Sequence, residues 1–299
     1  MTAVAEALAV FERERPHLLG LAYRMLGVVA DAEDVVQDAW LRWQAADRSG
    51  IDRPGAWLTT VATRLALDRL RAQRRRREQY VGPWLPEPVL LEPGPEEMAE
   101  LSESLTIGFL SLLDNLQPVE RAVYLLVEVF GRPYAEVGES IGKSEVACRQ
   151  IVSRARRRLR QDHDEAAPHD DRAAEADRLV HALLAAITQG DVAGALASVA
   201  PDVVLVSDGG PHRRAARRPV VGPDRVVRLL INLYRREGYG EAEFSMPRIN
   251  GCPGLVVSFD GVVDLVLVFE VHAGAGVSKI WVMRNPDKLT ALQSPFPVH

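Results

Sequence analysis

The stretch that most constrains the fold runs from residue 116 to residue 160, where three short amphipathic segments follow one another. Apolar residues recur at three- and four-residue steps over residues 119–130, which is the period of a helix with one buried face. Gly131 ends that segment, and Gly142 separates a short second helix from a third, which Ser144 is placed to cap. A short helix, a glycine turn and a free third helix are the spacing of a helix-turn-helix.

The third segment, residues 145–160, divides into an apolar side and a polar side when its residues are placed about 100° apart on a helix. The apolar residues are Ala147, Cys148, Ile151, Val152, Ala155 and Leu159. The polar residues are Glu145, Arg149, Gln150, Ser153, Arg156, Arg157 and Arg160. Guanidinium and amide groups bind base edges and phosphates, so this helix is predicted to enter a DNA groove rather than to be a solvated, arginine-rich end. The predicted DNA contacts are Ser144, Glu145, Arg149, Gln150, Ser153, Arg154 and Arg157.

Arginine is concentrated in two stretches, although the formal net charge of the 299-residue chain is −5. Residues 53–77 contain eight arginines and a single acid, Asp68, and residues 149–160 contain six arginines and no acid. Between them, residues 87–103 contain six glutamates and no base. Two basic patches on either side of an acidic connector suit a protein that holds a polyanion at two places.

Length and composition exclude several other classes of protein. A chain of this length is expected to form two or three domains. Its two cysteines, Cys148 and Cys252, imply neither a disulfide framework nor a zinc site, and no metal or cofactor is predicted. The longest apolar run, residues 262–271, contains two acids and is too short to cross a membrane, and the N-terminal stretch lacks a signal-peptide core. We therefore expect a cytoplasmic protein without membrane contact.

Upstream of the helix-turn-helix, the periodicity predicts three longer helices. The first covers residues 4–26, the second begins with Asp31 as its N-cap, and the third opens near Pro54 and ends in a run of arginines. The apolar residues expected to be buried are Val36, Trp40 and Trp43 in the second helix and Trp57, Val61 and Leu65 in the third.

Two blocks in this part of the chain resemble an extracytoplasmic-function (ECF) sigma factor of bacterial RNA polymerase. They read D-A-E-D-V-V-Q-D-A-W-L-R-W over residues 31–43 and P-G-A-W-L-T-T-V-A-T-R-L-A-L-D-R-L-R over residues 54–71, and the helix-turn-helix follows in the right order. The resemblance covers roughly residues 5–162. It implies two helical domains, sigma region 2 and sigma region 4, in a protein that brings core polymerase to particular promoters and helps to open the DNA.

The resemblance also assigns roles to residues. The helix over residues 31–43 would dock on the β′ clamp of polymerase, and region 4 on the β flap. The loop around residues 45–53 and the helix over residues 57–71 would open and hold the minus-ten element. The helix over residues 144–160 would read the minus-thirty-five element. Many family members carry Asn where this chain has Arg64, so their minus-ten base preference is not carried over. The implied polymerase contacts are Asp31, Asp34, Gln37, Asp38 and Trp40, and the implied minus-ten contacts are Arg64, Asp68, Arg71 and Arg74.

Each of these features has a plainer interpretation when it stands alone. An acidic helix face is usually solvated, a tryptophan stripe is usually core, and an arginine run is often a tail, so only their joint order favours the polymerase hypothesis. Two rivals remain. The first is a dimeric repressor or activator that uses the helix-turn-helix without polymerase, and the second is a small-molecule enzyme tethered by its N-terminal half. The sigma-factor hypothesis predicts a monomer when the protein is free.

The connector over residues 80–89 reads Y-V-G-P-W-L-P-E-P-V, in which three prolines exclude a helix. A flexible linker does not need a tryptophan, so Trp84 and Leu85 are expected to pack on a surface. This sequence is similar to that of the ECF subgroup that carries a SnoaL-like C-terminal extension. A helix over residues 95–113 is expected to lead into region 4.

After a polar break at residues 162–171, the pattern changes to helices followed by strands. Helices are predicted over residues 173–189, directly after Gly190-Asp191, and over residues 223–236. A curled antiparallel sheet is predicted from strands at 203–208, 241–249, 255–260, 262–272 and 277–284, which gives an α+β cone. The fragments D-G-G (208–210) and N-P-D-K-L (285–289) resemble the SnoaL-like, ketosteroid-isomerase-related extension. The predicted boundaries are 1–79 for region 2, 80–103 for a linker, 104–162 for region 4, 163–172 for a second linker and 173–299 for the SnoaL-like domain.

Enzymes related to this fold hold one carboxylate as a base inside an apolar cone. The available candidates, Asp208, Asp260, Asp264 and His272, show no diagnostic spacing, so no catalytic residue is predicted. We expect instead that the third domain regulates the other two in cis, by covering the connector and biasing their spacing. The residues expected to make or brace this contact are Trp84, Asp208, Gly209, Gly210, Asn285 and Asp287.

Overall fold

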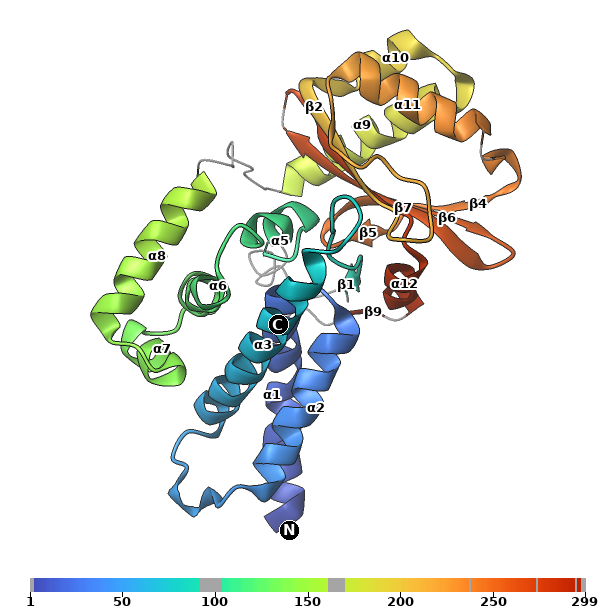
Figure 1. Cartoon of the computed structure of the whole chain (residues 1–299). Helices are drawn as coiled ribbons and strands as arrows, with labels where there is room; N and C mark the ends of the chain where they lie inside the picture. Colours follow the sequence, from blue (N-terminus) through green and yellow to red (C-terminus); the bar gives the residue numbers. More distant parts are fainter. Residues whose placement is uncertain are drawn as a thin grey trace.

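The computed structural model describes residues 3–91, 104–160, 170–236, 238–272, 274–293 and 295–296. Figure 1 shows a domain of long helices at the N-terminus, a domain of short helices beside it, and a sheet covered by helices. This is the predicted fold class, two helical domains followed by an α+β domain.

The N-terminal domain is built from α1 (Ala3–Leu26), α2 (Val29–Ala45) and α3 (Pro54–Arg77), with a short 3₁₀ turn, η1 (Arg48–Gly50), before α3. The prediction that Asp31 caps α2 is wrong. The helix begins two residues earlier, at Val29, after Val28, whose side chain makes no capping bond. The free amide of Val29 is instead satisfied by a carboxylate from the connector, which local sequence does not reveal.

The buried face of α3 lies one residue away from the predicted one. Trp57, Val61 and Leu65 are only partly buried, whereas the core residues of the helix are Leu58, Ala62, Thr63, Ala66, Leu67 and Leu70. The large Trp57 side chain lies at the edge of the core, with its ring centroid 5.4 Å from that of Trp43. Small residues face α1 and α2 instead, which lets the three helices approach closely.

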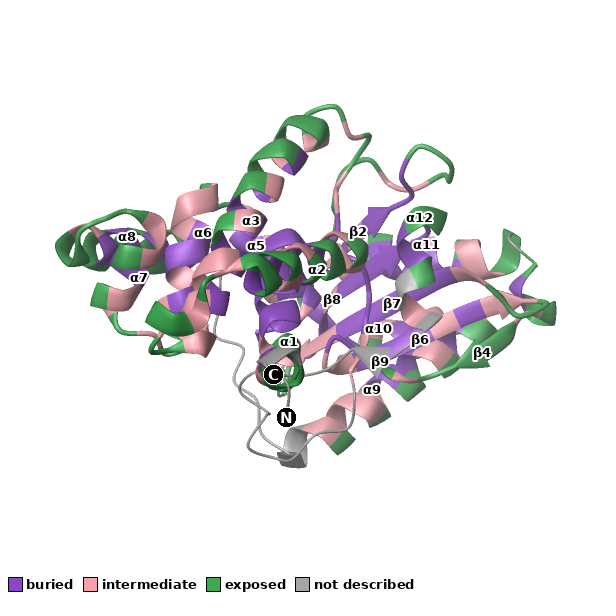
Figure 2. Ribbon diagram, turned by 90° about the horizontal axis from the view of Figure 1, so that it is seen from below, coloured by how far each residue is buried: buried purple, intermediate pink, exposed green. Residues whose placement is uncertain are grey.

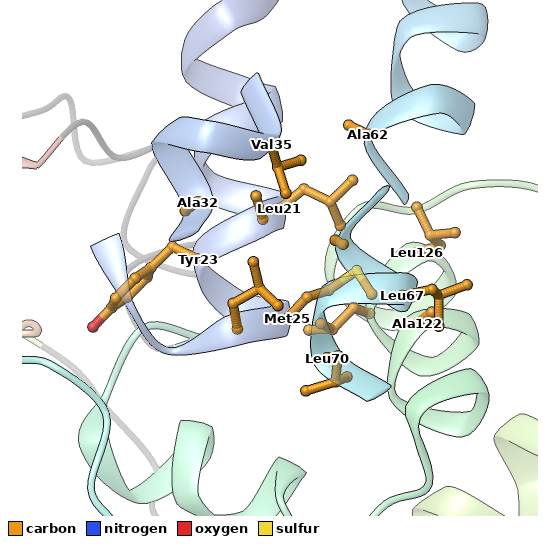
Figure 3. Packing of buried hydrophobic residues seen from close by; sticks show 14 of the residues in the cluster. Leu21, Tyr23, Met25, Ala32, Val35, Ala62, Leu67, Leu70, Ala122 and Leu126 are labelled. Atoms are coloured by element: carbon orange, nitrogen blue, oxygen red, sulfur yellow. The ribbon is translucent and has the colours of Figure 1, made fainter. Parts of the chain in front are cut away.

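The second helical domain consists of α5 (Ile107–Leu113), α6 (Pro118–Tyr124), the π-helical turn η3 (Leu125–Val129), α7 (Tyr134–Ile141) and α8 (Glu145–Arg160). Of these elements, α6 with η3, α7 and α8 form the predicted helix-turn-helix. Of the helix expected over residues 95–113, the structure has the part from Ile107, and residues 95–103 lie outside the described residues. One apolar core runs through both helical domains, and Figure 3 shows Ala122 and Leu126 beside Leu67 of α3.

The C-terminal domain opens with α9 (Asp170–Gln189) and α10 (Val192–Ala197) and later adds α11 (Pro223–Arg236). Its strands are β2 (Val199–Asp208), β3 (Val220–Val221), β4 (Glu243–Ser245), β5 (Arg248–Ile249), β6 (Cys252–Phe259), β7 (Val262–His272), β8 (Gly276–Met283) and β9 (Pro295–Phe296). Its short helical elements are η4 (Tyr239–Glu241), α12 (Pro286–Leu289) and η5 (Thr290–Gln293).

The strand order is β3-β2-β8-β7-β6-β5-β1-β9, with β4 also paired to β6. The pairs β6–β7 and β7–β8 are antiparallel as predicted, but β2 runs parallel to β8, because a long connection that includes α11 returns the chain beside it in the same direction. A strand was not predicted at β1 (Leu90–Leu91), which pairs with β5 and β9. The connector therefore adds a strand to the sheet of the third domain.

Alternate residues of β7 face opposite sides of the sheet. Leu265 and Phe269 pack in the cluster beneath the helices α9 and α11, whereas Val266 packs on the other side with Leu85 of the connector and Ile107 of α5. Strand β8 is buried along almost its whole length (Figure 2). One face of the sheet is thus covered by its own helices, and the other by the connector and the second helical domain.

Candidate polymerase and promoter interface

The polar side of α8 is open to solvent, as the sequence predicts. Ser144 caps the helix, since its Oγ accepts a hydrogen bond from the backbone N–H of Ala147 at 3.2 Å. Arg149 forms a 2.5 Å ion pair with Glu145, and its guanidinium lies 5.5 Å from the ring centroid of Tyr134. These contacts hold an exposed guanidinium over the first turn of the helix. The other predicted contacts on this side are exposed as well: Gln150, Ser153, Arg154 and Arg157.

Two further arginines attach α8 to the rest of its domain. Arg156 donates two hydrogen bonds of 2.8 Å to Glu128, and Arg158 donates one of 2.8 Å to Glu120. Exposed pairs of this kind contribute little to stability, on the order of 0–1 kcal/mol each. Their consequence is positional, because they fix the orientation of α8 against α6 and η3.

The acidic side of α2 is joined to α3 by polar contacts. Arg69 donates to Asp34 at 2.8 Å and to Asp38 at 3.0 Å, and Gln73 donates to Asp31. The side chain of Asp34 nevertheless remains 59% exposed. The predicted polymerase contacts therefore form an ordered surface rather than a set of freely solvated chains.

The remaining predicted polymerase contacts differ in burial. Gln37 is exposed, whereas Trp40 is half-buried with its ring centroid 4.9 Å from that of Phe11. Trp40 thus belongs partly to the core of the first domain and leaves only an edge for a partner.

The second helical domain contacts part of the predicted promoter-facing side of α3, where Arg64, Asp68 and Arg71 remain exposed. Arg64 donates to the carbonyl oxygen of Ser140 at 2.8 Å, and the hydroxyls of Thr60 and Ser140 lie 2.8 Å apart. At the start of the helix, Arg53 pairs with Glu136 at 2.6 Å. A 380 Å³ cavity lies between α3 and α7 beside these contacts. The two helical domains are therefore closed onto one another.

The same closure involves the far end of α3. Arg74 donates to the carbonyl oxygen of Leu116 at 3.2 Å and to the side chain of Gln117 at 3.0 Å. Asp68 and Arg71 form an exposed pair with each other at 3.0 Å. Of the four predicted minus-ten contacts, Arg64 and Arg74 are thus occupied by the second domain.

A buried guanidinium ties the two helical domains together. Arg121 of α6 donates to the carbonyl oxygen of Arg24, at the end of α1, at 3.0 and 2.7 Å, and to Asp114 at 2.5 Å. Arg77 of α3 shares the Asp114 carboxylate at 2.9 Å. Burial lowers the pKa of both guanidinium groups, that of Arg77 to about 10, and the Asp114 carboxylate opposes this effect. Arg77 therefore remains charged at neutral pH.

The connector is held by a buried carboxylate of the third domain. Asp208 is 1% exposed, and its two oxygens accept hydrogen bonds from the Tyr80 hydroxyl at 2.6 Å, the Leu85 amide at 2.9 Å and the Lys288 ammonium at 2.6 Å. The amide of Gly210 donates to the same carboxylate at 3.0 Å. Burial lowers the pKa of Lys288 to about 8, and the Asp208 carboxylate opposes this shift. The Asp208 carboxylate therefore favours the charged form of Lys288, which burial disfavours.

The tryptophan of the connector lies between the first and third domains. The Arg77 guanidinium is 3.2 Å from the ring centroid of Trp84, and the Lys288 ammonium is 4.1 Å from it. Gly27 passes so close that a Cβ there would lie 2.8 Å from the ring, and it also needs a φ of +68°. Asn285 adds a hydrogen bond of 2.9 Å to the Tyr80 hydroxyl. The Arg77 and Lys288 cations are therefore placed to make cation–π interactions with the Trp84 ring.

Asn250 joins all parts of the chain at one point. Its side chain donates to the Tyr23 hydroxyl at 3.0 Å and to the carbonyl oxygen of Leu105 at 2.7 Å, and it accepts from the Val89 amide at 3.0 Å. It is fully buried and adopts a φ of +51°, a conformation that asparagine tolerates better than most residues. The first domain, the connector, the second domain and the third domain are therefore linked through one amide.

Glu87 of the connector caps the start of α2. Its carboxylate accepts from the Val29 amide at 2.7 Å, where the positive end of the helix dipole favours a negative charge. Burial raises the pKa of Glu87 to about 7, and the hydrogen bond from Val29 opposes that rise. The cap therefore titrates near neutral pH.

Comparison with known proteins agrees with this arrangement. A family model for Sigma-70 region 2 matches residues 10–76, and one for Sigma-70 region 4 matches residues 108–159. The ECF RNA polymerase sigma factor SigJ of Mycobacterium tuberculosis is 37% identical over 292 residues, which cover 94% of this chain and 92% of SigJ. The chain belongs to the ECF sigma factors.

Other similarities of this sigma factor extend over its whole length. The probable ECF sigma factor SigI of Mycobacterium tuberculosis is 29% identical, over 96% of both chains. The crystal structure of Mycobacterium tuberculosis SigJ superposes with a TM-score of 0.74 at 34% identity, covering 96% of this chain and 99% of that one. The similarity therefore includes the C-terminal domain. Through regions 2 and 4, this sigma factor binds core RNA polymerase and promoter DNA and directs the enzyme to promoters.

The four candidate catalytic residues of this sigma factor lie in different surroundings. Asp208 has both oxygens occupied by the connector contacts, and Asp264 pairs with Arg213 at 3.0 Å. Asp260 is exposed in the turn between β6 and β7, where its φ is +50°, and His272 ends β7. Its relatives SigJ and SigI are sigma factors. None of the described helices combines the length and apolar character needed to span a membrane.

Sequence reasoning selected several connector contacts and missed others. Trp84, Asp208, Gly210 and Asn285 lie around the connector, whereas the Asp287 carboxylate is 71% exposed, with the His212 ring 3.8 Å away. Lys288, Tyr80, Asn250, Glu87 and Arg121 were missed. Tyr80, Glu87 and Lys288 stand inside the quoted motifs, so the motifs themselves could have pointed to them. Asn250 and Arg121 carry no local signal, because Asn250 bonds Tyr23, Leu105 and Val89, and Arg121 bonds the Arg24 carbonyl, at separations of 97 to 227 residues. The partner of Glu87, Val29, lies 58 residues away.

Proposed function

We propose that this sigma factor rests in a closed form and that its C-terminal domain regulates it in cis through the connector. The observation that supports this most is the Asp208 carboxylate, which holds the Tyr80 hydroxyl and the Leu85 amide of the connector together with Lys288. Because the connector joins the two DNA-binding domains, a surface that binds it biases their spacing. A partner that prefers the open spacing then shifts the population toward activity.

Closure has a direct consequence for promoter opening. The minus-ten contacts on α3, Arg64 and Arg74, are engaged by Ser140 and Gln117 of region 4. DNA and region 4 cannot occupy this side of α3 together, so the two regions separate before the minus-ten element is held. The polar side of α8 stays open in the same form and is ready to read DNA.

The polymerase contact is assigned to the acidic side of α2, where Asp31, Asp34, Gln37, Asp38 and Trp40 would face the β′ clamp while region 4 faces the β flap. The exposure of Asp34 and Gln37 supports this assignment. Arg69 fixes the Asp34 and Asp38 carboxylates, so their ordering costs little when the surface binds a partner.

The DNA contacts and the domain boundaries form the rest of the proposal. The minus-ten contacts are Arg64, Asp68, Arg71 and Arg74, and the minus-thirty-five contacts are Ser144, Glu145, Arg149, Gln150, Ser153, Arg154 and Arg157. The boundaries are 1–79 for region 2, 80–103 and 163–172 for the linkers, 104–162 for region 4 and 173–299 for the regulatory domain. Trp84, Asp208, Gly209, Gly210, Asn285 and Asp287 make or brace the regulatory contact.

We also infer that the C-terminal domain performs no chemistry. The space between its sheet and helices, where related enzymes hold a substrate, is packed with apolar side chains such as Leu267, Phe269 and Ile280. Asp208, whose oxygens are both occupied, is a poor base in this form. We therefore expect the C-terminal domain to act as a binding surface for the connector.

Run-off transcription with purified core polymerase tests the proposal. We expect a promoter-specific transcript with the monomeric protein, and a changed transcript yield with Trp84→Ala. Asp287→Ala should act in the same direction but more weakly, because its carboxylate is exposed. Asp260→Ala and His272→Ala are the controls and should transcribe normally.

Two other outcomes would favour the rivals. Tight binding to a palindromic site by a dimer, with no transcript, would show a repressor or activator that works without polymerase. A turnover activity that Asp260→Ala or His272→Ala abolishes, together with transcription that Trp84→Ala leaves unchanged, would show that the C-terminal domain is an enzyme.

A further inference from the structure

The loop between β2 and β3, residues 209–219, has an unusual charge. It carries four arginines and one histidine, and no acid occurs between Asp208 and Asp224. Asp208 is buried and already paired with Lys288, so it does not neutralise the loop. The loop is therefore a concentrated positive segment in a chain whose net charge is −5.

The backbone of this loop is held in place at both halves. The Arg213 amide donates to the carbonyl oxygen of Gly209 at 3.0 Å, and the Arg213 guanidinium pairs with Asp264 at 3.0 Å. In the second half, the Ser207 hydroxyl accepts from the Ala216 amide at 2.8 Å and donates to its carbonyl oxygen at 3.3 Å. One arginine thus anchors the loop, and the other three are presented by an ordered backbone.

Those three arginines have exposed side chains and no charge partner among the described residues. Arg214, Arg217 and Arg218 are exposed, and none of them forms an ion pair within the part of the chain that the structure describes. Holding three cations close together without counter-charges lowers the stability of the fold, because the cations repel one another. A fold that keeps them adjacent is suited to an anionic partner outside the chain.

The loop lies beside the end of α3 and the connector. A Cβ added to Gly82 would lie 3.7 Å from the Cα of Arg217, and Figure 1 shows the loop after β2 next to the segment that follows α3. The last turn of α3 carries Arg75 and Arg76, which are also exposed and form no ion pair among the described residues. We call these five residues the arginine strip: Arg75, Arg76, Arg214, Arg217 and Arg218. The exposed acid Glu78 follows Arg75 and Arg76 in the chain, but the five arginines of the strip outnumber it.

We propose that the arginine strip binds the phosphates of the duplex DNA between the two promoter elements. This inference rests on the proposed placement of the promoter along α3 and α8. The connector joins the reader of one element to the reader of the other, and the DNA between the elements must pass the same part of the molecule. Guanidinium groups pair well with phosphate oxygens, and such contacts set affinity and position without reading sequence. The third domain would thereby contribute to promoter affinity as well as to regulation.

The test compares two triple variants of the full chain, each reconstituted with core polymerase. Arg214→Gln/Arg217→Gln/Arg218→Gln removes three charges from the strip. Arg225→Gln/Arg228→Gln/Arg236→Gln removes three from exposed positions of α11, which covers the other face of the same sheet. Affinity for a duplex carrying a promoter selected by the wild-type holoenzyme is measured over a range of salt concentrations. Affinity of each variant for core polymerase is measured separately.

We expect the strip variant to lower the slope of log K against log salt by up to about three, one for each phosphate that is no longer bound. The same decrease is expected on a scrambled duplex of equal length, since phosphate contacts carry no sequence information. The α11 variant should keep the wild-type slope.

Equal slopes for the two variants, or a decrease confined to core-polymerase affinity, would overturn the inference. The second of these results would assign the strip to an acidic polymerase surface instead. If the wild-type protein gives a run-off transcript and the strip variant keeps the wild-type slope, this inference fails while the proposed function stands. If the wild-type protein gives no transcript, the proposed function itself fails.

Discussion

The two helices that we propose to face DNA are in opposite states. On α8, the apolar side is buried, the polar side is exposed, and Arg149 is held over the first turn by Glu145 and Tyr134. On α3, Arg64 is bonded to the backbone of region 4. One helix is ready to meet DNA, and the other is used by the protein itself.

The difference follows from what surrounds each helix. The end of α3 runs into the connector, and the third domain holds that connector through Asp208, Lys288 and Asn285. Helix α8 is fixed by pairs within its own domain, Arg156 with Glu128 and Arg158 with Glu120. Under the proposed assignment of these helices to the two promoter elements, regulation acts on the minus-ten side and leaves the minus-thirty-five reader unchanged.

The largest effect is expected from breaking the closure itself. Arg121→Met removes a buried guanidinium that bridges the Arg24 carbonyl and Asp114, and leaves Arg77 as the remaining cation on that carboxylate. Loss of one partner of a buried ionic contact costs about 3–5 kcal/mol. Urea unfolding should show this loss in stability. Arg154→Met, an exposed change on α8, is the matched control and should leave the midpoint unchanged.

A similar but smaller effect is expected at the connector. Asp208→Ala removes the acceptor of Tyr80, Leu85 and Lys288, and Lys288 is then free to lose its proton, which limits the cost to about 3 kcal/mol. Protease cleavage within the connector should accelerate in this variant. Unchanged cleavage would mean that the third domain does not hold the connector. Binding of the isolated variant to duplex DNA through α8 should remain normal.

The cap on α2 gives this side of the molecule a pH dependence. The pKa of Glu87 rises from an ordinary 4.5 to about 7 in the folded protein, so the folded state binds this proton more tightly than the unfolded state. Its contribution to stability is complete below about pH 4.5 and is lost as pH rises through 7, by at most about 3 kcal/mol.

Glu87→Gln should remove this part of the pH dependence, because the amide keeps an acceptor for Val29 and has no charge to bury. Thermal unfolding from pH 5 to pH 8 compares the two proteins. Parallel curves for the two proteins over that range would contradict the assignment to Glu87.

The smallest effects are expected on α8, where two arginines should behave differently. Arg149→Ala removes a guanidinium placed to take two acceptors of a base, which should cost about 1–3 kcal/mol and relax preference at one base pair. Arg157→Ala should weaken all sequences alike and lower the salt slope by about one. Binding to a library of minus-thirty-five variants measures both, and equal effects on sequence preference would refute the division of roles.

Predictions from the sequence are most accurate where the structure depends on residues that are close together in the chain. The two sides of α8 follow from helical period alone, and the cap by Ser144 is confirmed. Two predictions about the first domain are wrong. One structure depends on a group far away in the chain, and the other depends on the sizes of the side chains. The cap of α2 comes from Glu87, 58 residues away, instead of from Asp31, and the buried side of α3 follows its small residues instead of Trp57.

The connector shows the same limit in another form. Its tryptophan and the Asp208 motif pointed to a contact with the third domain, but Lys288 in the quoted N-P-D-K-L fragment was passed over. Lysine is rarely buried without a partner, so its burial cannot be predicted until the partner is known. Asn250 is hidden for the same reason, since its partners come from three separate parts of the chain.

The closed form is tested most directly by a distance between the two regions. Spin labels on Ala72→Cys of α3 and Lys143→Cys of the helix-turn-helix report it, in a background with Cys252→Ser, since the remaining Cys148 is fully buried. Pulsed electron paramagnetic resonance should give one short distance in the free protein and a longer one with core polymerase and promoter. A long distance in the free protein, or the same short distance in the transcribing complex, would contradict the account.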